Sequence, residues 1–412
     1  MIDFSEKGLI YMKISVGVLF GGNSVEHEVS VISASQAMHA LNREKYNVVP
    51  IYITKDSRFY TGEALLDIAK YKDIPALLSE CEEIMLKKGS MNAEMVKVKA
   101  PLFGKKVVGT VDMFIPVVHG TNVEDGTLQG FLEMLGVPYA LCDVTASAIG
   151  MDKYAMKCVL RDAGVNVLDA VCFYSREYFK NSEDVIKRIE DKLDYPVIVK
   201  PVNLGSSVGI KMAKDKESLV EAIEEAATFS HKVLVERAVT SLKEVNCSVL
   251  GDYEEAIASV LEEPVSSGGD ILDFADKYQG GNKSSGGGSK GMSGSSRKVP
   301  ADVTGEQEKK IKEMCLTTFK ALNCNGVARI DVMIDEASGE IFVNEINTIP
   351  GSLSFYLWEA AGLKFDELMD KIVYYAQKRF REREKLSFSY DTNLLSDFGA
   401  RSLKNGSKGS KN

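Results

Sequence analysis

The stretch ARIDVMIDEASGEIFVNEINTIPGSLS, residues 328–354, predicts two β-strands joined by a turn at residues 335–340. Side chains alternate between the two faces of a strand, so a register that pairs Asp331 with Glu345 also pairs Arg329 with Asn347 on the same face. Two carboxylates and an amide oxygen are hard ligands that suit Mg²⁺, which usually also binds a substrate's phosphates. The adjacent guanidinium could stabilise negative charge that develops in a reaction. A plain surface hairpin could carry the same charges, so the rest of the chain must decide.

Size and composition limit the classes of function. The chain has 412 residues, 45% of them hydrophobic and 26% charged, which allows roughly two to three ordinary globular domains. The net charge is −9 without a dominant basic stripe, so neither nucleic acid nor a membrane is expected as the main partner. Seven scattered cysteines without a CxxC pair favour reduced thiols, and we expect a cytoplasmic protein.

The N-terminal part predicts an α/β domain over residues 1–141, in which residues 1–11 are a possible extension. Apolar runs at 14–20, 47–53 and 111–118 predict strands, and residues 28–41 and 127–135 predict helices. Alternating strands and helices predict a mostly parallel, Rossmann-like sheet.

Two further units follow, which we place at residues 142–235 and 236–386. Helices are predicted at 151–163, 301–322 and 365–384, and strands at 196–200, 232–236 and 244–250. Residues 279–296, QGGNKSSGGGSKGMSGSS, cannot bury apolar surface, so we expect a mobile segment. It could be a passive insertion, but its place before the hairpin favours a lid. Residues 387–412 predict a disordered tail.

A second polar motif is VKPVNLGSSVGI, residues 199–210, where Lys200 ends a strand and a Gly/Ser-rich loop follows. Backbone N–H groups of such a loop can bind phosphates, and the lysine adds a positive charge. Alone, the motif is equally typical of a surface turn. Together with the carboxylate hairpin it predicts a site for ATP and a divalent metal ion.

Four motifs in order make the chain resemble the D-alanine–D-alanine ligase family of ATP-grasp carboxylate–amine ligases. They are LFGGNSVEHEVS (19–30), HGTNVEDGTLQGFLEMLGVPY (119–139) with GMDK (150–153), VKPVNLGSSVGI (199–210), and ARIDVMI with VNEINTIPG (328–351). The resemblance implies an ATP-grasp fold behind a Rossmann-like N-terminal domain, a homodimer, and ATP, D-alanine and two Mg²⁺ ions, which Mn²⁺ could replace. It also implies phosphorylation of the first D-alanine, followed by attack of a second amine on the acyl phosphate.

The resemblance assigns each matched residue a role. On the substrate side, Glu26 would bind the ammonium of the first D-alanine, His119 would shape its pocket, Glu124 would hold neighbouring residues, and Ser206 would link Glu26 with Tyr278. On the ATP side, Lys153, Lys200, Lys277 and Ser207 would contact phosphates, and Glu236 and Glu244 would bind adenine and ribose. At the reacting atoms, Asp331, Glu345 and Asn347 would hold the metal ions, and Arg329 and the Gly351 N–H would stabilise the transition state.

Three departures from the family pattern concern the substrate side. Val123 replaces a usual glycine, which could move Glu124, and the lid is unusually rich in glycine. The segment after Gly351 is about four residues shorter than usual, and either Ser352 or Ser354 could bind the second carboxylate. The acceptor could therefore be D-alanine, D-serine, D-lactate or another amino acid, although Tyr278 favours an amine. A non-catalytic ATP-binding regulatory protein is the alternative outside catalysis.

Overall fold

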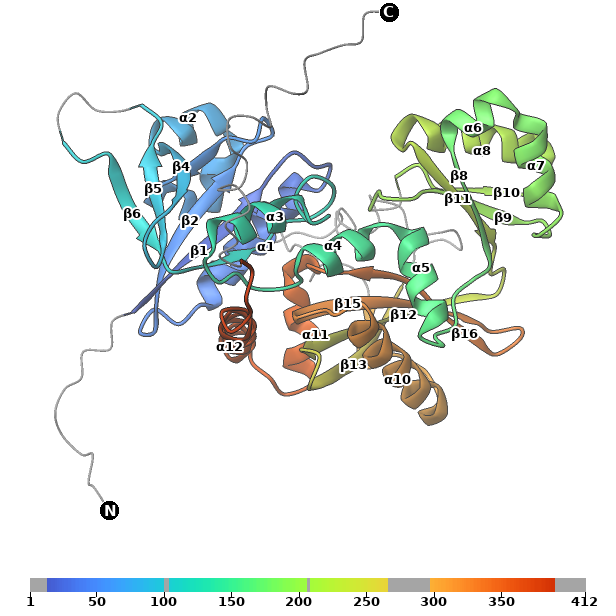
Figure 1. The fold of residues 1–412 in the computed structure, drawn as a ribbon. Helices are drawn as coiled ribbons and strands as arrows, with labels where there is room; N and C mark the ends of the chain where they lie inside the picture. The colour runs from blue at the N-terminus through green and yellow to red at the C-terminus, as the bar shows by residue number, and fades with distance from the viewer. Residues whose placement is uncertain (1–12, 100–103, 206–207, 266–296, 390–412) are drawn as a thin grey trace, which may run out of the picture.

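The computed structural model describes residues 13–99, 104–205, 208–265 and 297–389, which form three β-sheets with flanking helices (Figure 1). The predicted extension, the predicted lid and nearly all of the predicted tail lie outside these residues. No helix within the described ranges is both long and apolar enough to cross a membrane.

The N-terminal sheet has seven strands in the order β6-β5-β4-β3-β2-β1-β7. The strands are β1 Ile14–Gly21, β2 Tyr46–Ile53, β3 Phe59–Thr61, β4 Glu82–Lys88, β5 Ala93–Lys97, β6 Val107–Val111 and β7 Met113–Pro116. The accompanying helices are α1 His27–Ala40, η1 Glu63–Leu66, η2 Ile68–Lys72, α2 Ile74–Ser79 and α3 Thr127–Leu135.

The prediction of a mostly parallel sheet is wrong. Strand β1 runs parallel to β2 and β7, whereas β2 to β6 pair successively antiparallel. The connections from β2 to β3 and from β4 to β5 to β6 are too short for the crossover helix that a parallel pair requires, so the chain turns back at each step.

A smaller antiparallel sheet, in the order β10-β9-β11-β8, lies at the upper right of Figure 1. Its strands are β8 Ala170–Tyr174, β9 Val197–Pro201, β10 Lys211–Ala213 and β11 Lys232–Arg237. Helices α6 Ser175–Lys180, α7 Ser182–Glu190 and α8 Lys216–Phe229 share its apolar core. Helices α4 Val144–Met151 and α5 Lys153–Asp162 precede it in the chain.

The third sheet carries the hairpin and has the order β14-β13-β12-β15-β16. Its elements are β12 Leu242–Gly251, β13 Ala256–Pro264, β14 Arg297–Lys298, β15 Gly326–Asp335 and β16 Glu340–Asn347, with helix α10 Gly305–Ala321. Alternate residues of β15, from Ala328 to Ile334, pack with α5 and α10 in one core. The intervening residues, Arg329 and Asp331 among them, therefore lie on the opposite face.

The predicted hairpin register is confirmed, and it depends on a β-bulge. Arg329 pairs with Asn347 and Asp331 with Glu345, but Val332 already pairs with Val343. Residue Asn344 is thus the extra residue on β16. A bulge re-aims the side chains that follow it. Without the bulge, Asp331 would pair with Asn344, and Glu345 would point to the apolar face.

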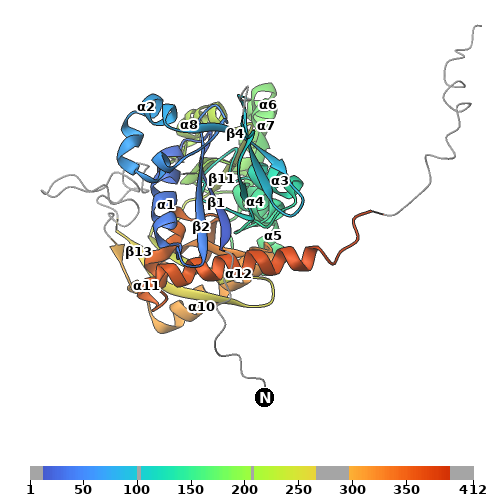
Figure 2. The same ribbon diagram turned by 90° about the vertical axis from the view of Figure 1, so that its left-hand side faces the viewer.

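The segment after the hairpin returns to the N-terminal sheet. It consists of η4 Gly351–Ser354, α11 Phe355–Ala360 and α12 Phe365–Arg383. Apolar residues of α12, including Met369 and Ile372, belong to the same core as Val18 and Phe20 of β1. Figure 2 shows α12 as a long helix below β1 and β2. This packing connects the end of the hairpin to the N-terminal domain.

Candidate active site

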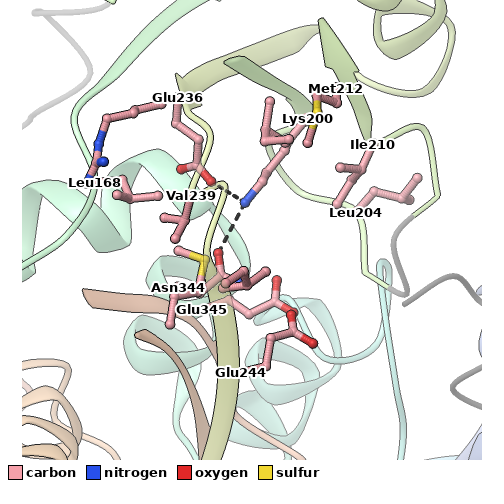
Figure 3. A pocket seen from close by; sticks show the side chains of 14 residues that line it. Leu168, Lys200, Leu204, Ile210, Met212, Glu236, Val239, Glu244, Asn344 and Glu345 are labelled. Carbon is pink, nitrogen blue, oxygen red and sulfur yellow. Dashed lines mark hydrogen bonds and ion pairs between the residues drawn. The ribbon is translucent and has the colours of Figure 1, made fainter. Parts of the chain in front are cut away.

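A pocket of about 680 Å³, partly open to solvent, lies between the second and third sheets. Its walls are mainly apolar, with acidic and basic groups gathered toward the hairpin (Figure 3). The lining residues are Leu168, Ile198, Lys200, Leu204, Ile210, Met212, Glu236, Arg237, Val239, Leu242, Glu244, Met333, Asn344 and Glu345.

Lys200 stands at the polar end of this pocket. Its ammonium pairs with Glu236 Oε1 and donates to Asn344 Oδ1 at 3.1 Å (Figure 3). The bulge residue Asn344 therefore connects β16 with β9, which carries Lys200. Sequence reasoning missed Asn344, although a signal exists: Val343 and Ile346 both lie in the core but are three residues apart, which breaks the two-residue alternation.

A second buried lysine, Lys157 of α5, approaches the other carboxylate oxygen of Glu236. Its Nζ lies 3.0 Å from Glu236 Oε2, and both side chains are only 1% exposed. Burial raises the pKa of Glu236, but the charges of Lys157 and Lys200 outweigh burial and lower the pKa to about 2. Burial lowers the pKa of Lys157, which Glu236 opposes. Glu236 is thus an ionised carboxylate between two ammonium groups.

On the polar face of the hairpin, hydrogen bonds and ion pairs hold the carboxylate and amide groups close together. Arg329 donates to both carboxylate oxygens of Asp331, from Nε at 2.7 Å and from Nη2 at 2.8 Å. Asn347 Nδ2 donates to Asp331 Oδ2 at 3.2 Å. Lys153 Nζ lies 3.0 Å from Glu345 Oε2 and donates to the Leu204 carbonyl at 2.9 Å. The predicted cluster therefore exists, and Lys153 connects it to the Gly/Ser-rich loop.

These groups fit a magnesium ion that shares phosphate ligands. Two carboxylates and one amide are too few for an all-protein cage, but Mg²⁺ commonly takes one or two carboxylates and completes its shell with phosphates and water. No group of three or more His, Cys, Asp or Glu side chains suited to a metal occurs in the described ranges.

Glu26 is buried where three segments meet. A Cβ atom built on Gly120 or Gly205 would come within 2.8 or 2.9 Å of its Oε2, so the carboxylate lies directly against both backbones. Gly120 also has φ +83°, which favours glycine. The first motif thus meets the HG turn and the Gly/Ser-rich loop, as the predicted substrate role of Glu26 requires.

His119 connects the HG turn to the segment around Gly351. Its Nδ1 lies 2.9 Å from the Ile349 carbonyl, and its Nε2 lies 3.0 Å from Ser33 Oγ. Ser33 Oγ in turn accepts the Ser352 N–H at 2.9 Å. Burial lowers the pKa of His119, so a neutral ring that donates from Nδ1 satisfies every group in this chain of hydrogen bonds.

Glu124 makes the second connection to that segment. It accepts the N–H groups of Gly120 at 3.0 Å and Ile349 at 2.9 Å, and the Thr348 hydroxyl at 3.2 Å. Burial, together with the nearby charge of Glu26, raises the pKa of Glu124 to about 7. The neighbouring Val123 is buried in the N-terminal core, while Glu124 keeps contacts through both oxygens.

The backbone after Gly351 has an unusual conformation. Ser352, Leu353 and Ser354 are left-handed in succession, with φ of 51° or 52°. This conformation costs L-residues roughly 1–2 kcal/mol each. Both serines are buried, and Ser354 Oγ has no hydrogen-bond partner in the described structure. Strain that persists beside polar groups is characteristic of functional sites.

Four predicted site residues, Ser206, Ser207, Lys277 and Tyr278, lie outside the described residues. The other predicted residues form two neighbouring groups. Lys153, Lys200, Glu236, Glu244, Arg329, Asp331, Glu345 and Asn347 belong to the pocket and the hairpin, and Glu26, His119, Glu124, Gly351, Ser352 and Ser354 lie where the N-terminal domain meets the segment after the hairpin.

Two matches between the sequence and known families decide the relationship. Residues 15–142 match the family model "D-ala D-ala ligase N-terminus", and residues 159–374 match "D-ala D-ala ligase C-terminus". The chain belongs to the D-alanine–D-alanine ligase family. Among curated members, the D-alanine–D-alanine ligase of Thermosipho melanesiensis is 38% identical over 382 residues, which is 93% of this chain and 98% of that protein.

Solved structures of family members share the fold. The D-alanine–D-alanine ligase from Coxiella burnetii is 28% identical with a TM-score of 0.76, over 96% of this chain and 99% of that chain. The VanG D-Ala:D-Ser ligase from Enterococcus faecalis is 34% identical with a TM-score of 0.72, over 89% of this chain and 100% of that chain. The chain therefore has the predicted ATP-grasp fold with an N-terminal domain.

Proposed function

We propose that the chain is an ATP- and Mg²⁺-dependent D-alanine–D-alanine ligase that makes a peptidoglycan precursor. The observation that carries the proposal is the position of the apolar pocket, which ends at Lys200 and at the Asp331–Glu345 hairpin. Apolar walls suit a nucleobase, and the polar end suits its phosphates and metal ions. The regulatory alternative does not require Arg329 beside the metal ligands.

ATP would lie with its adenine among Leu168, Ile198 and Met333 and its phosphates toward Lys200 and Lys153. The ammonium of Lys153 contacts both the Leu204 carbonyl in the loop and Glu345 on the hairpin, so it lies between the two sides of the proposed phosphate site. Lys157 and Lys200 already pair with the two carboxylate oxygens of Glu236. Glu236 would therefore contact the nucleotide only beside these ion pairs.

Two Mg²⁺ ions, or Mn²⁺ in their place, would be held by Asp331, Glu345 and Asn347, and would neutralise charge on the transferred phosphoryl group. The chain's own charged and polar groups would do the remaining positioning. Glu26 would bind the ammonium of the first D-alanine and so direct its carboxylate toward the phosphates. Arg329 and the Gly351 N–H would stabilise the tetrahedral anion formed when the second amine attacks. Ser206, Ser207, Lys277 and Tyr278 retain the roles that the resemblance implies.

D-serine is a second candidate acceptor, because a D-Ala:D-Ser ligase is 34% identical to this chain. Both amino acids carry the same ammonium and carboxylate and differ by one hydroxyl group. Adding D-serine to an assay with limiting D-alanine distinguishes them, because the mixed dipeptide differs in mass. We also propose a homodimer, which light scattering tests, and a cytoplasmic location, where ATP is supplied.

The decisive experiment follows phosphate release from ATP and Mg²⁺ with and without D-alanine. D-alanine should stimulate release, and mass spectrometry should detect the dipeptide. Hydroxylamine added in place of the acceptor should trap the acyl phosphate as a hydroxamate. If D-alanine does not stimulate phosphate release and no hydroxamate forms, the chain is not this ligase.

A further inference from the structure

Helix α1 carries a stripe of buried polar residues beside its apolar ones. Glu26, at the N-cap, and then Ser30 and Ser33 follow one another at four and three residues, which places them on one face of the helix. All three are buried. A buried polar group costs free energy unless it is hydrogen-bonded, so each hydroxyl of this stripe needs partners. Ser30 has them in the Gly21 N–H and the Val117 carbonyl.

The partners of Ser33 are His119 and the backbone that follows Gly351. Ser33 Oγ lies 3.0 Å from His119 Nε2 and accepts the Ser352 N–H at 2.9 Å. His119 Nδ1 lies 2.9 Å from the carbonyl oxygen of Ile349, which can only accept a hydrogen bond. In the neutral ring the proton is therefore on Nδ1, and the Ser33 hydroxyl donates to Nε2. This arrangement fixes the direction of every hydrogen bond in the chain.

These hydrogen bonds hold Gly351 from both sides. Before it, the carbonyl of Ile349 is held by the imidazole and its N–H by Glu124. After it, the Ser352 N–H is held by Ser33. Among the described residues, none accepts the Gly351 N–H. The donor that is proposed to meet the oxyanion is therefore flanked by fixed groups while it is itself unused.

The segment depends on such support because its backbone is strained. Ser352, Leu353 and Ser354 are left-handed in succession, and strain of this kind persists only where the surroundings over-determine the conformation. Leu353 provides apolar support, because it is buried in the N-terminal core against α1. Ser33 provides polar support from the same helix.

We propose that Ser33 is a positioning residue that fixes the Gly351 N–H at the place where the tetrahedral oxyanion forms. It acts through Ser352 and His119, and it contacts neither substrate nor metal itself. The inference rests on the proposed ligase function. An oxyanion donor is most effective when it is already aimed at the developing charge, because no free energy is then spent on reorienting it. Since α1 also carries Glu26, one helix sets the distance between the ammonium site and the oxyanion donor.

The competing explanation is that Ser33 only ties α1 to the segment after the hairpin. The two explanations differ in which step of the reaction slows when the hydroxyl is removed. A misplaced oxyanion donor slows the attack of the amine on the acyl phosphate but not the formation of the acyl phosphate. The phosphoryl group then returns to ADP more often before the amine attacks. General loosening of the segment, which follows the metal ligand Asn347, slows both steps.

Positional isotope exchange measures this partition. ATP carries a heavy oxygen isotope in the bridge between its β- and γ-phosphates. Each return of the phosphoryl group from the acyl phosphate to ADP can move the label to a non-bridging β-position. Ser33→Ala should lower the rate of dipeptide formation about 10- to 100-fold, the effect of displacing a catalytic group without removing it. The ratio of isotope exchange to dipeptide should rise by the same factor.

Two further variants and one spectrum sharpen the test. Ser33→Cys, whose thiol is a weaker donor and acceptor, should fall between wild type and Ser33→Ala. Ser147→Ala is the matched control, because Ser147 on α4 is equally buried but its hydroxyl has no hydrogen-bond partner among the described residues. It should leave both rates unchanged. Heteronuclear NMR of the ligand-free wild type should show His119 protonated at Nδ1, and Ser33→Ala should shift the Nε2 resonance.

Either of two results would overturn the role of Ser33. One is a Ser33→Ala enzyme whose ratio of isotope exchange to dipeptide stays at the wild-type value, whether or not both rates fall. The other is a wild-type His119 that carries its proton on Nε2, a measurement that needs no variant to fold. A wild-type protein that forms neither dipeptide nor hydroxamate would instead contradict the proposed function.

Discussion

Replacing Lys157 by Met should destabilise the protein strongly, because it leaves Glu236 with one ammonium instead of two. Both side chains are 1% exposed, and Nζ lies 3.0 Å from Oε2, so water cannot replace the missing cation. Removing one partner of a buried pair costs roughly 3–5 kcal/mol. The pKa gives a consistent magnitude. The fall in the pKa of Glu236 from 4.5 to about 2 corresponds to about 3 kcal/mol of net stabilisation of the carboxylate, left after the two lysines together have offset the cost of burial.

The pH dependence gives the prediction its sign. The folded state lowers the pKa of Glu236, so the stabilisation is fully present above pH 4.5 and is lost as the pH falls toward 2. The difference in unfolding free energy between wild type and Lys157→Met should therefore be roughly 3–5 kcal/mol at pH 7, the cost of removing one partner of a buried pair, and should shrink below pH 4.5.

Urea denaturation of the ligand-free protein at several pH values measures this difference. Lys187→Met is the matched control, because Lys187 pairs with Asp191 on an exposed helix surface, where such a pair contributes about 0.5 kcal/mol or less. Adding Glu236→Gln to Lys157→Met should recover part of the loss. A Lys157→Met variant no less stable than Lys187→Met would refute the idea that Lys157 compensates a buried charge.

The remaining predictions concern the substrate side and the hairpin. The folded state raises the pKa of Glu124 from 4.5 to about 7, so ionisation of this carboxyl destabilises the fold as the pH rises through that window. In urea unfolding, the stability of Glu124→Gln relative to wild type should therefore increase by about 3 kcal/mol between pH 4.5 and 8. A stability difference that stays constant with pH would contradict this. Arg329→Ala should retain ATP binding in calorimetry but lose about 100-fold or more in kcat, and near-normal turnover would remove Arg329 from the transition state. Asn344→Ala removes the amide that accepts from Lys200 and should cost about 1 kcal/mol of Mg²⁺-dependent ATP binding in calorimetry; unchanged binding would show that Asn344 does not position Lys200.

The hairpin could be predicted because its information is local. Alternation along residues 328–347 sets the faces, and the turn between the strands sets the pairing. The bulge at Asn344 was missed although the alternation breaks there, because two consecutive polar residues, Asn344 and Glu345, stand between the core residues Val343 and Ile346. The antiparallel half of the N-terminal sheet was missed for a related reason: β3 to β6 are short strands whose pairing is determined by their connections.

Long-range clusters account for the site residues that the sequence did not indicate. Lys157 is one more lysine in the amphipathic helix α5, and only the fold shows that it points at Glu236. The serines after Gly351 looked accessible in sequence, but three left-handed residues bury them.

The charged side chains of the site form ion pairs. When ligands bind, each side chain can exchange its protein partner for a ligand group without being left unpaired. Arg329 pairs with Asp331 and Lys153 pairs with Glu345, so these two cations, which are proposed to contact phosphate or the oxyanion, are neutralised by acids that are proposed to bind metal. When nucleotide and metal enter together, each acid can pass to the metal ion as its cation passes to phosphate. ATP that bound without a metal ion would pair with the two cations and leave Asp331 and Glu345 as unpaired carboxylates in a mostly buried site, which costs free energy. The same pairs that make the hairpin resemble an ordinary surface feature would therefore couple nucleotide binding to metal binding.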